Sequence, residues 1–177
     1  MLGSIRTYFF EREKKKRLSE GAERKIHFKK DQPNHYGLLL DATQVDHRQV
    51  VTNFAEELRK KGNRVKILGF LDKKNESISV PFDIFTPADL AKVSKVPRSP
   101  AIESFIKQPF DILINMSIHQ NYKSLEYICT LSHAAFRVGP WFQQVKYNPY
   151  DLCLDAGEAA TLPEWISELM HTLEKIY

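Results

Sequence analysis

Short apolar runs alternate with amphipathic stretches along most of the chain. Apolar runs of this length, bounded by polar residues, are typical of strands that are buried on both faces of a sheet. The clearest run contains a single aspartate, Asp111, among otherwise apolar residues. The pattern predicts six strands, at residues 36–40, 64–70, 80–85, 110–116, 136–139 and 151–154.

Between these runs, apolar residues recur at the spacing of an α-helix. One helix is predicted from Asp46 or His47 up to Gly62, which acts as a stop signal. Residues 86–89, Thr-Pro-Ala-Asp, have the cap and first-turn residues of a helix start. Further helices are predicted at residues 100–106, 122–135 and 162–176, the last with an apolar stripe of Trp165, Ile166, Leu169, Leu173 and Ile176.

Strands that alternate with helices predict a parallel sheet, because parallel neighbours need crossover connections. The expected fold class is therefore α/β and Rossmann-like: a mostly parallel sheet with helices on both faces, preceded by a basic N-terminal helix. The chain is expected to consist of residues 1–34, the basic helix and a linker, and one α/β domain at 35–177. We expect the strands at 36–40 and 110–116 to be neighbours in the sheet centre.

Positive charge is concentrated at the N-terminus. Residues 1–30 hold ten Lys and Arg against four Glu, a net +6, whereas the other residues hold 16 basic and 18 acidic residues, a net −2. Such a segment favours contact with a polyanion. The candidate nucleic-acid or anion-binding residues are Arg12, Lys14, Lys15, Lys16, Arg17, Arg24 and Lys25, with the aromatic residues Tyr8, Phe9, Phe10 and Phe28 available to stack on bases.

Three other interpretations of this N-terminal segment stay open. It can be a solvated tail, a segment that binds a protein partner, or a helix on a membrane surface that uses Leu2, Ile5 and Phe9. RNA or the ribosome is the partner that we consider first, and a membrane surface comes after it.

Polar side chains follow two of the predicted central strands. In parallel sheets, ligands bind beyond the carboxyl ends of the strands, near the point where the strand order reverses. Residues 41–47 and 115–121 are expected at this point, and they form a candidate ligand crevice with Asp41, Asp46, His47, Asn115, Ser117 and His119. The alternative is that these residues only cap helices and solvate loops.

Several kinds of site are disfavoured. The chain contains neither G-x-G-x-x-G nor G-x-x-x-x-G-K-[ST], and both loops of the crevice lack the glycine that close phosphate approach needs. Neither a metal-ligand spacing nor a glycine-flanked serine elbow is present, so we expect no catalytic residue, no metal and no cofactor. Cys129 and Cys153 are expected to be reduced thiols. Without a signal peptide or membrane span, a cytoplasmic location is expected.

Two passages carry a resemblance to known families. Residues 110–115, FDILIN, and 131–139, LSHAAFRVG, resemble a family of small uncharacterised Bacteroidota proteins, carried as a domain of unknown function. This resemblance covers nearly the whole chain and implies no activity. Residues 110–139 are also similar to the N-terminal domain of heptosyltransferase-like glycosyltransferases, but the second domain that binds the sugar nucleotide in those enzymes has no counterpart here.

Three functional hypotheses follow from these patterns. The first is a non-enzymatic binding or accessory protein that contacts RNA or the ribosome through its basic N-terminal segment. The second is a small-molecule-binding or vestigial glycosyltransferase-like domain that uses the crevice. The third is a peripheral membrane adaptor.

Overall fold

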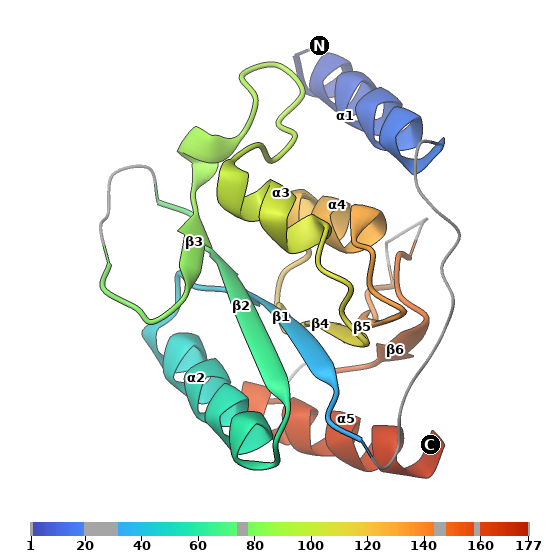
Figure 1. Ribbon diagram of the computed structural model, residues 1–177. Coiled ribbons are helices and arrows are strands. Elements are labelled where there is room, and N and C mark those ends of the chain that lie inside the picture. The colour runs from blue at the N-terminus through green and yellow to red at the C-terminus, as the bar shows by residue number, and fades with distance from the viewer. Residues whose placement is uncertain (1, 20–31, 74–77, 144–147, 158–159, 177) are drawn as a thin grey trace.

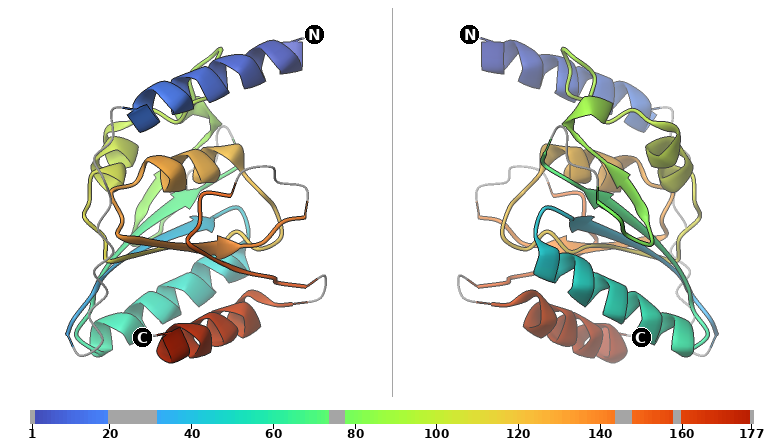
Figure 2. Two further views of the ribbon diagram at one scale, coloured as in Figure 1. Left: turned by 90° about the vertical axis from the view of Figure 1, so that its right-hand side faces the viewer. Right: turned by 90° about the vertical axis from the view of Figure 1, so that its left-hand side faces the viewer.

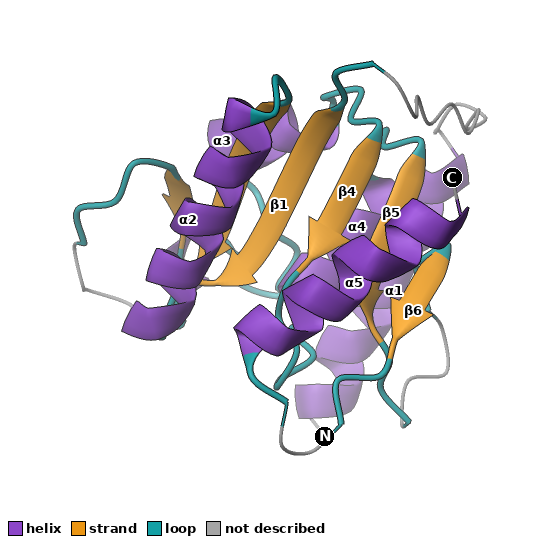
Figure 3. Cartoon of the chain, turned by 90° about the horizontal axis from the view of Figure 1, so that it is seen from below, coloured by secondary structure: helices purple, strands orange, loops and turns teal. Residues whose placement is uncertain are grey.

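A computed structural model describes residues 2–19, 32–73, 78–143, 148–157 and 160–176. Its centre is a six-stranded sheet in the order β3-β2-β1-β4-β5-β6, and every neighbouring pair is parallel. This is the strand order of a doubly wound Rossmann-like domain. Figure 3 shows β1, β4, β5 and β6 side by side. The strands are β1 (His35–Asp41), β2 (Arg64–Phe70), β3 (Asp83–Phe85), β4 (Ile112–Asn115), β5 (Phe136–Pro140) and β6 (Leu152–Leu154).

The two strands expected at the centre are neighbours there. β1 pairs in parallel with β4, with Tyr36 opposite Ile112 and Leu39 opposite Asn115, and it pairs on its other side with β2. Asp111 lies half-buried just before β4, and its Oδ2 accepts a hydrogen bond of 2.7 Å from the backbone N–H of His35. The aspartate therefore joins the starts of the two central strands.

Helices cover both faces of the sheet (Figures 1 and 2). One face carries α2 (Val45–Lys60) and α5 (Leu162–Ile176), and the other carries α3 (Pro100–Ile106) and α4 (Lys123–Leu131). The helix α1 (Leu2–Ser19) lies outside α4 as a further layer (Figure 2). Within the described residues, no helix combines the length and the apolar character needed to cross a bilayer.

The alternation of side chains along β1 explains its continuous apolar run. Leu38 and Leu40 belong to the core beneath α2 and α5, whereas Leu39 belongs to the core beneath α3 and α4, and all three are fully buried. A strand that is covered on both faces needs apolar residues at every position, and this is the pattern from which the strand was predicted.

Two helices are shorter than the sequence pattern predicts. The predicted helix at 122–135 ends at Leu131, because Ser132 takes an extended conformation and its Oγ accepts a hydrogen bond from the Ala134 N–H. Thr86 caps its helix as expected, with Asp89 completing the capping box, but this helix, η1 (Pro87–Asp89), is a single 3-10 turn. Local serine hydrogen bonds compete with helix continuation, and apolar periodicity does not register them.

The N-terminal helix is anchored to the domain. Phe10 is only 3% exposed, and its ring centroid lies 5.4 Å from that of Tyr127 in α4. Glu13 also forms an ion pair with Arg98, just before α3. One side of α1 is therefore committed to packing, and the orientation of its other side is fixed.

Candidate functional site

The outward side of α1 gathers exposed aromatic and basic residues. Because α1 turns by 100° per residue, its positions 5, 8, 9, 12, 15 and 16 share one side, and Phe10 points nearly the opposite way. All six side chains are exposed, including Tyr8 at 62%, Phe9 at 38% and Ile5 at 50%. We call this set the α1 stripe: Ile5, Tyr8, Phe9, Arg12, Lys15 and Lys16.

The α1 stripe contains three of the seven basic residues proposed from the sequence. Arg12, Lys15 and Lys16 occupy its C-terminal half, and the apolar and aromatic members occupy its N-terminal half. Lys14 and Arg17 lie on the same helix, but their side chains fall outside the described structure, as do Arg24 and Lys25 entirely. A surface that offers cations next to exposed aromatic rings has the two features that single-stranded nucleic acids bind.

The second candidate lies where β1 and β4 end, at the point where strand order reverses. We call it the switch-point cluster: Asp41, His47, Ser117, His119 and Tyr122. Two direct contacts are found among its members, since the Tyr122 hydroxyl donates to Asp41 Oδ2 over 3.2 Å and the rings of His47 and His119 lie 5.7 Å apart. Ser117 belongs to the loop after β4, two residues before His119. The two loops proposed from the sequence therefore meet at this edge of the sheet.

Asp41 is the acidic centre of the switch-point cluster. It ends β1, is 9% exposed, and its Oδ1 accepts a hydrogen bond of 2.9 Å from the Thr43 N–H. Burial, together with the charge and the hydrogen bond of Asp41, raises the pKa of Tyr122 well above its usual value. The phenol therefore stays protonated and serves as a hydrogen-bond donor to the carboxylate.

The paired histidines lie where α2 begins. His47 is half-buried in the first turn of α2, while His119 is exposed on the loop before α4. Burial, and then the nearby His119, lower the pKa of His47, although Asp41 and Asp46 act in the opposite direction. His47 is therefore held mainly as a neutral imidazole near pH 7.

Helix capping does not account for these residues. The N-cap residues of α2 and α4 are Gln44 and Tyr122, and neither makes a side-chain capping hydrogen bond. By contrast, the side chains of Thr86 and Ser99 cap η1 and α3, as capping rules predict. The two helices that begin at the switch-point cluster thus differ from η1 and α3 in lacking a side-chain cap.

Two of the crevice residues proposed from the sequence have other roles. The Asn115 side chain donates to the Tyr150 hydroxyl over 2.6 Å and accepts from the Ser117 N–H over 3.1 Å, which makes it part of the framework. Asp46 is exposed in the first turn of α2, where a carboxylate interacts favourably with the helix dipole. Tyr122 was missed in the sequence, because its contact with Asp41 spans 81 residues.

Buried polar atoms without a partner distinguish the switch-point cluster from a solvated loop. Ser117 is 2% exposed, and neither its Oγ nor His47 Nδ1 has a hydrogen-bond partner among the described residues. Each such atom costs about 1–3 kcal/mol relative to a paired one. Unpaired buried polar groups are rare in native proteins, and they call for a physical explanation.

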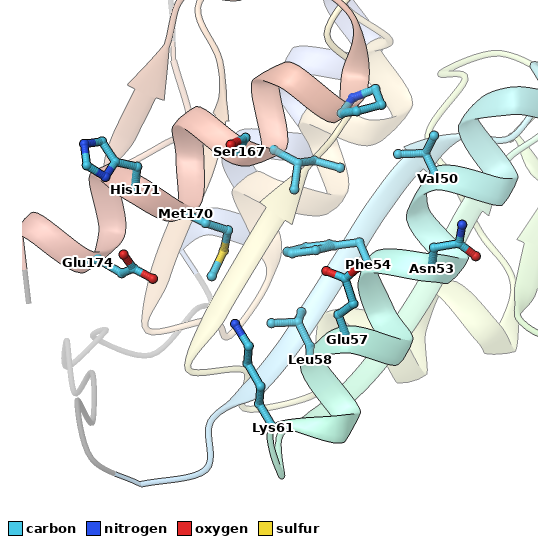
Figure 4. Close-up of a pocket in the computed structure, with 12 residues that line it drawn as sticks. Val50, Asn53, Phe54, Glu57, Leu58, Lys61, Ser167, Met170, His171 and Glu174 are labelled. Atoms are coloured by element: carbon cyan, nitrogen blue, oxygen red, sulfur yellow. The ribbon is translucent and has the colours of Figure 1, made fainter.

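A separate groove lies on the surface between α2 and α5 (Figure 4). Its volume is about 590 Å3, with Phe54, Leu58 and Met170 among its apolar lining and Glu57, Lys61 and Glu174 among its polar lining. Helical periodicity alone does not reveal such a groove, because it depends on the spacing between the two helices. Within the described part of the chain, no three His, Cys, Asp or Glu side chains are placed to hold a metal ion.

Comparison with known proteins assigns the chain to a family but identifies no activity. Neither the curated proteins nor the solved structures contain a match to this chain. The model of a family of unknown function (DUF6913) matches residues 6–176. This match runs from the first turns of α1 to the end of α5, through all six strands. The chain therefore belongs to this family of unknown function, DUF6913.

Proposed function

We propose that the protein is a non-enzymatic binding or accessory protein that contacts RNA through the α1 stripe. The observation that supports this most is the anchoring of α1 by Phe10, which leaves Tyr8, Phe9, Arg12 and the two lysines exposed together on the other side. A fixed orientation lowers the entropy lost on binding, because the helix does not have to be ordered first.

The chemistry of the α1 stripe matches single-stranded RNA. Arg12, Lys15 and Lys16 neutralise phosphates, and Tyr8 and Phe9 offer ring faces on which bases stack. The net charge of +6 in residues 1–30 attracts RNA to this side of the molecule, because the rest of the chain carries −2. Phosphate contacts and stacking are both tolerant of sequence, so we expect little base preference.

The proposal places the protein in the cytoplasm, where RNA and ribosomes are encountered. Two further expectations from the resemblance remain predictions. These are the Bacteroidota origin of the family and the likeness of residues 110–139 to the N-terminal domain of heptosyltransferase-like glycosyltransferases. Those residues form β4, α4 and β5 and include the loop that carries Ser117 and His119.

The test measures binding of the full-length chain to a labelled single-stranded RNA by fluorescence anisotropy, across a salt series. Replacing Arg12, Lys15 and Lys16 by Ala should weaken binding and reduce the slope of log affinity against log salt by about 2, since each phosphate contact contributes roughly 0.7. Replacing Tyr8 and Phe9 by Ala should weaken binding by about 1–3 kcal/mol per lost stack and leave the slope unchanged.

A matched control removes the same charge from another face. Arg59, Lys60 and Lys61 are exposed at the end of α2, so replacing these three by Ala should leave RNA affinity unchanged. Equal losses in both triple variants would show unspecific attraction and contradict the proposal. Binding to anionic vesicles is measured in parallel. Strong vesicle binding that depends on Ile5 and Phe9, together with weak RNA binding, would show that the partner of the α1 stripe is a membrane surface and not RNA. If the chain binds neither, the proposal fails.

A further inference from the structure

Ser117 and His47 retain hydrogen-bonding capacity that the described structure does not use. Two polar side chains nearby are satisfied locally, since Thr43 Oγ1 accepts from the Asp72 N–H and the Asn115 side chain bonds to Tyr150 and to the Ser117 backbone. The buried groups of these described segments that keep unused capacity are Ser117 Oγ, His47 Nδ1 and the second lone pairs of the Asp41 carboxylate. All of them lie within the switch-point cluster, on segments that come from β1, α2 and the loop after β4.

The charges around these groups disfavour an anionic ligand. Asp41 and Asp46 are near enough to His47 to affect its pKa, and Asp72 likewise affects that of Tyr122. Residues 41–47 and 115–121 also contain no glycine that would let a phosphate approach the backbone closely. A ligand that fits must bring hydrogen-bond donors for Asp41 and His47 and an acceptor for the Ser117 hydroxyl.

We propose that the switch-point cluster binds a neutral molecule with a vicinal diol, such as a free sugar or the ribose of a nucleoside. A hydroxyl both donates and accepts, so two adjacent hydroxyls can donate to Asp41 and His47 and accept from Ser117 Oγ. The uncapped first turns of α2 and α4 supply backbone N–H groups at the same edge of the sheet. Tyr122 provides a ring for the apolar side of the ligand.

His119 controls access to the site. Its side chain is exposed, and its ring lies 5.7 Å from that of the half-buried His47 at an interplanar angle of 32°. Exposed side chains change rotamer on the picosecond to nanosecond timescale. A rotation of His119 uncovers His47 without moving the strands, and the bound diol then takes the place of the second ring.

The test follows the histidine ring resonances of the full-length chain by NMR during titration with four probes. The probes are adenosine, 2′,3′-dideoxyadenosine, D-ribose and inorganic phosphate. Adenosine and D-ribose should shift the His47 and His119 signals, whereas dideoxyadenosine should bind at least about tenfold more weakly, which corresponds to the loss of one or two hydrogen bonds. Phosphate should shift neither signal. If only adenosine binds, the ligand is a nucleoside, and if D-ribose also binds, the diol alone suffices.

Two serine variants separate binding from folding. Ser117→Ala should lower adenosine affinity about tenfold and leave Tm unchanged or higher, because its hydroxyl has no partner to lose. Ser99→Ala is the matched control, since it removes the N-cap hydrogen bond of α3 and should lower Tm without changing adenosine affinity.

Each contrary result overturns the proposal. No response to adenosine and D-ribose excludes a diol site, and equal binding of dideoxyadenosine shows recognition of the base. A response to phosphate alone shows an anion site. A lower Tm in Ser117→Ala shows that its hydroxyl is paired in solution, for example with an ordered water molecule, and is structural.

Discussion

Gly139 in β5 lies flat against the ring of Tyr150, so a Cβ atom at this position would overlap with the phenol. The ring is held in place from the other end, because the Tyr150 hydroxyl accepts a hydrogen bond from the Asn115 side chain at the end of β4. Burial raises the pKa of Tyr150 well above its usual value, which keeps this hydroxyl protonated. A glycine, a tyrosine and an asparagine together therefore set the spacing between two strand ends.

Gly139→Ala should lower the free energy of unfolding by about 1–3 kcal/mol, as expected for overpacking of a filled core. Urea denaturation monitored by circular dichroism measures this change. The control is the same substitution in a Tyr150→Ala background, where the ring is absent and the additional cost of the methyl group should disappear. Equal costs in both backgrounds would mean that backbone conformation, and not the contact with Tyr150, requires the glycine.

At the scale of elements, α5 covers one face of the sheet together with α2. Leu169 is fully buried, Trp165 and Leu173 are 2% and 3% exposed, and all three pack in the core that α5 shares with α2. The apolar stripe of this helix was predicted from the sequence, and these three residues lie on its buried side as predicted. Ile176, which was also predicted to belong to the stripe, is 50% exposed in the last turn of the helix. At its start, Glu164 Oε2 accepts hydrogen bonds from the backbone N–H and the hydroxyl of Thr161, and these two bonds lower the pKa of Glu164.

Leu169→Ala should reduce the free energy of unfolding by about 2–5 kcal/mol, because it leaves a cavity in a packed core. Equilibrium unfolding in urea gives the value. The neighbouring Glu168 is exposed, and Glu168→Ala should change stability by less than about 0.5 kcal/mol. A loss for Leu169→Ala as small as that of the control would show that α5 is peripheral.

The sequence pattern predicted the elements whose apolar residues form a continuous local run. It did not predict features that depend on a contact between residues far apart in the chain. The strand predicted at 64–70 coincides with β2, and the predicted helix at 100–106 coincides with α3, because an apolar run and a Ser-Pro start are local signals. The meeting of the loops after β1 and β4 also follows from topology, which the pattern predicted. The contact of Tyr122 with Asp41 and that of Phe10 with Tyr127 join distant segments, so no local signal marks them.

At the scale of the whole molecule, two partly buried histidines make stability depend on pH. Burial is the main cause that lowers the pKa of both His35 and His47 from the ordinary value of 6.5. The unfolded chain therefore binds protons more readily than the folded chain. The contribution of these two neutral histidines to the free energy of unfolding is fully present above pH 6.5. It is lost as the pH falls below that value toward their lower pKa values in the folded chain.

The free energy of unfolding should therefore decrease between about pH 7 and pH 5, a range in which carboxylates titrate little. Urea denaturation at several pH values measures the slope. Replacing His35 and His47 together by Gln should flatten the slope in this range, and the slope should be absent from the native chain near pH 8. A native slope that persists in the double variant would assign the pH dependence to other groups.

The position of α5 in the chain also has a consequence for synthesis on the ribosome. Because α5 follows all six strands, the sheet is translated before the helix that completes one of its two covers. Until α5 emerges, the apolar face that it will occupy is protected by α2 on one side only. Partly exposed hydrophobic faces make nascent chains prone to aggregate. The opposite face has α3 and α4 already in place, so a chaperone that assists this protein during translation is expected to shield the face beneath α5.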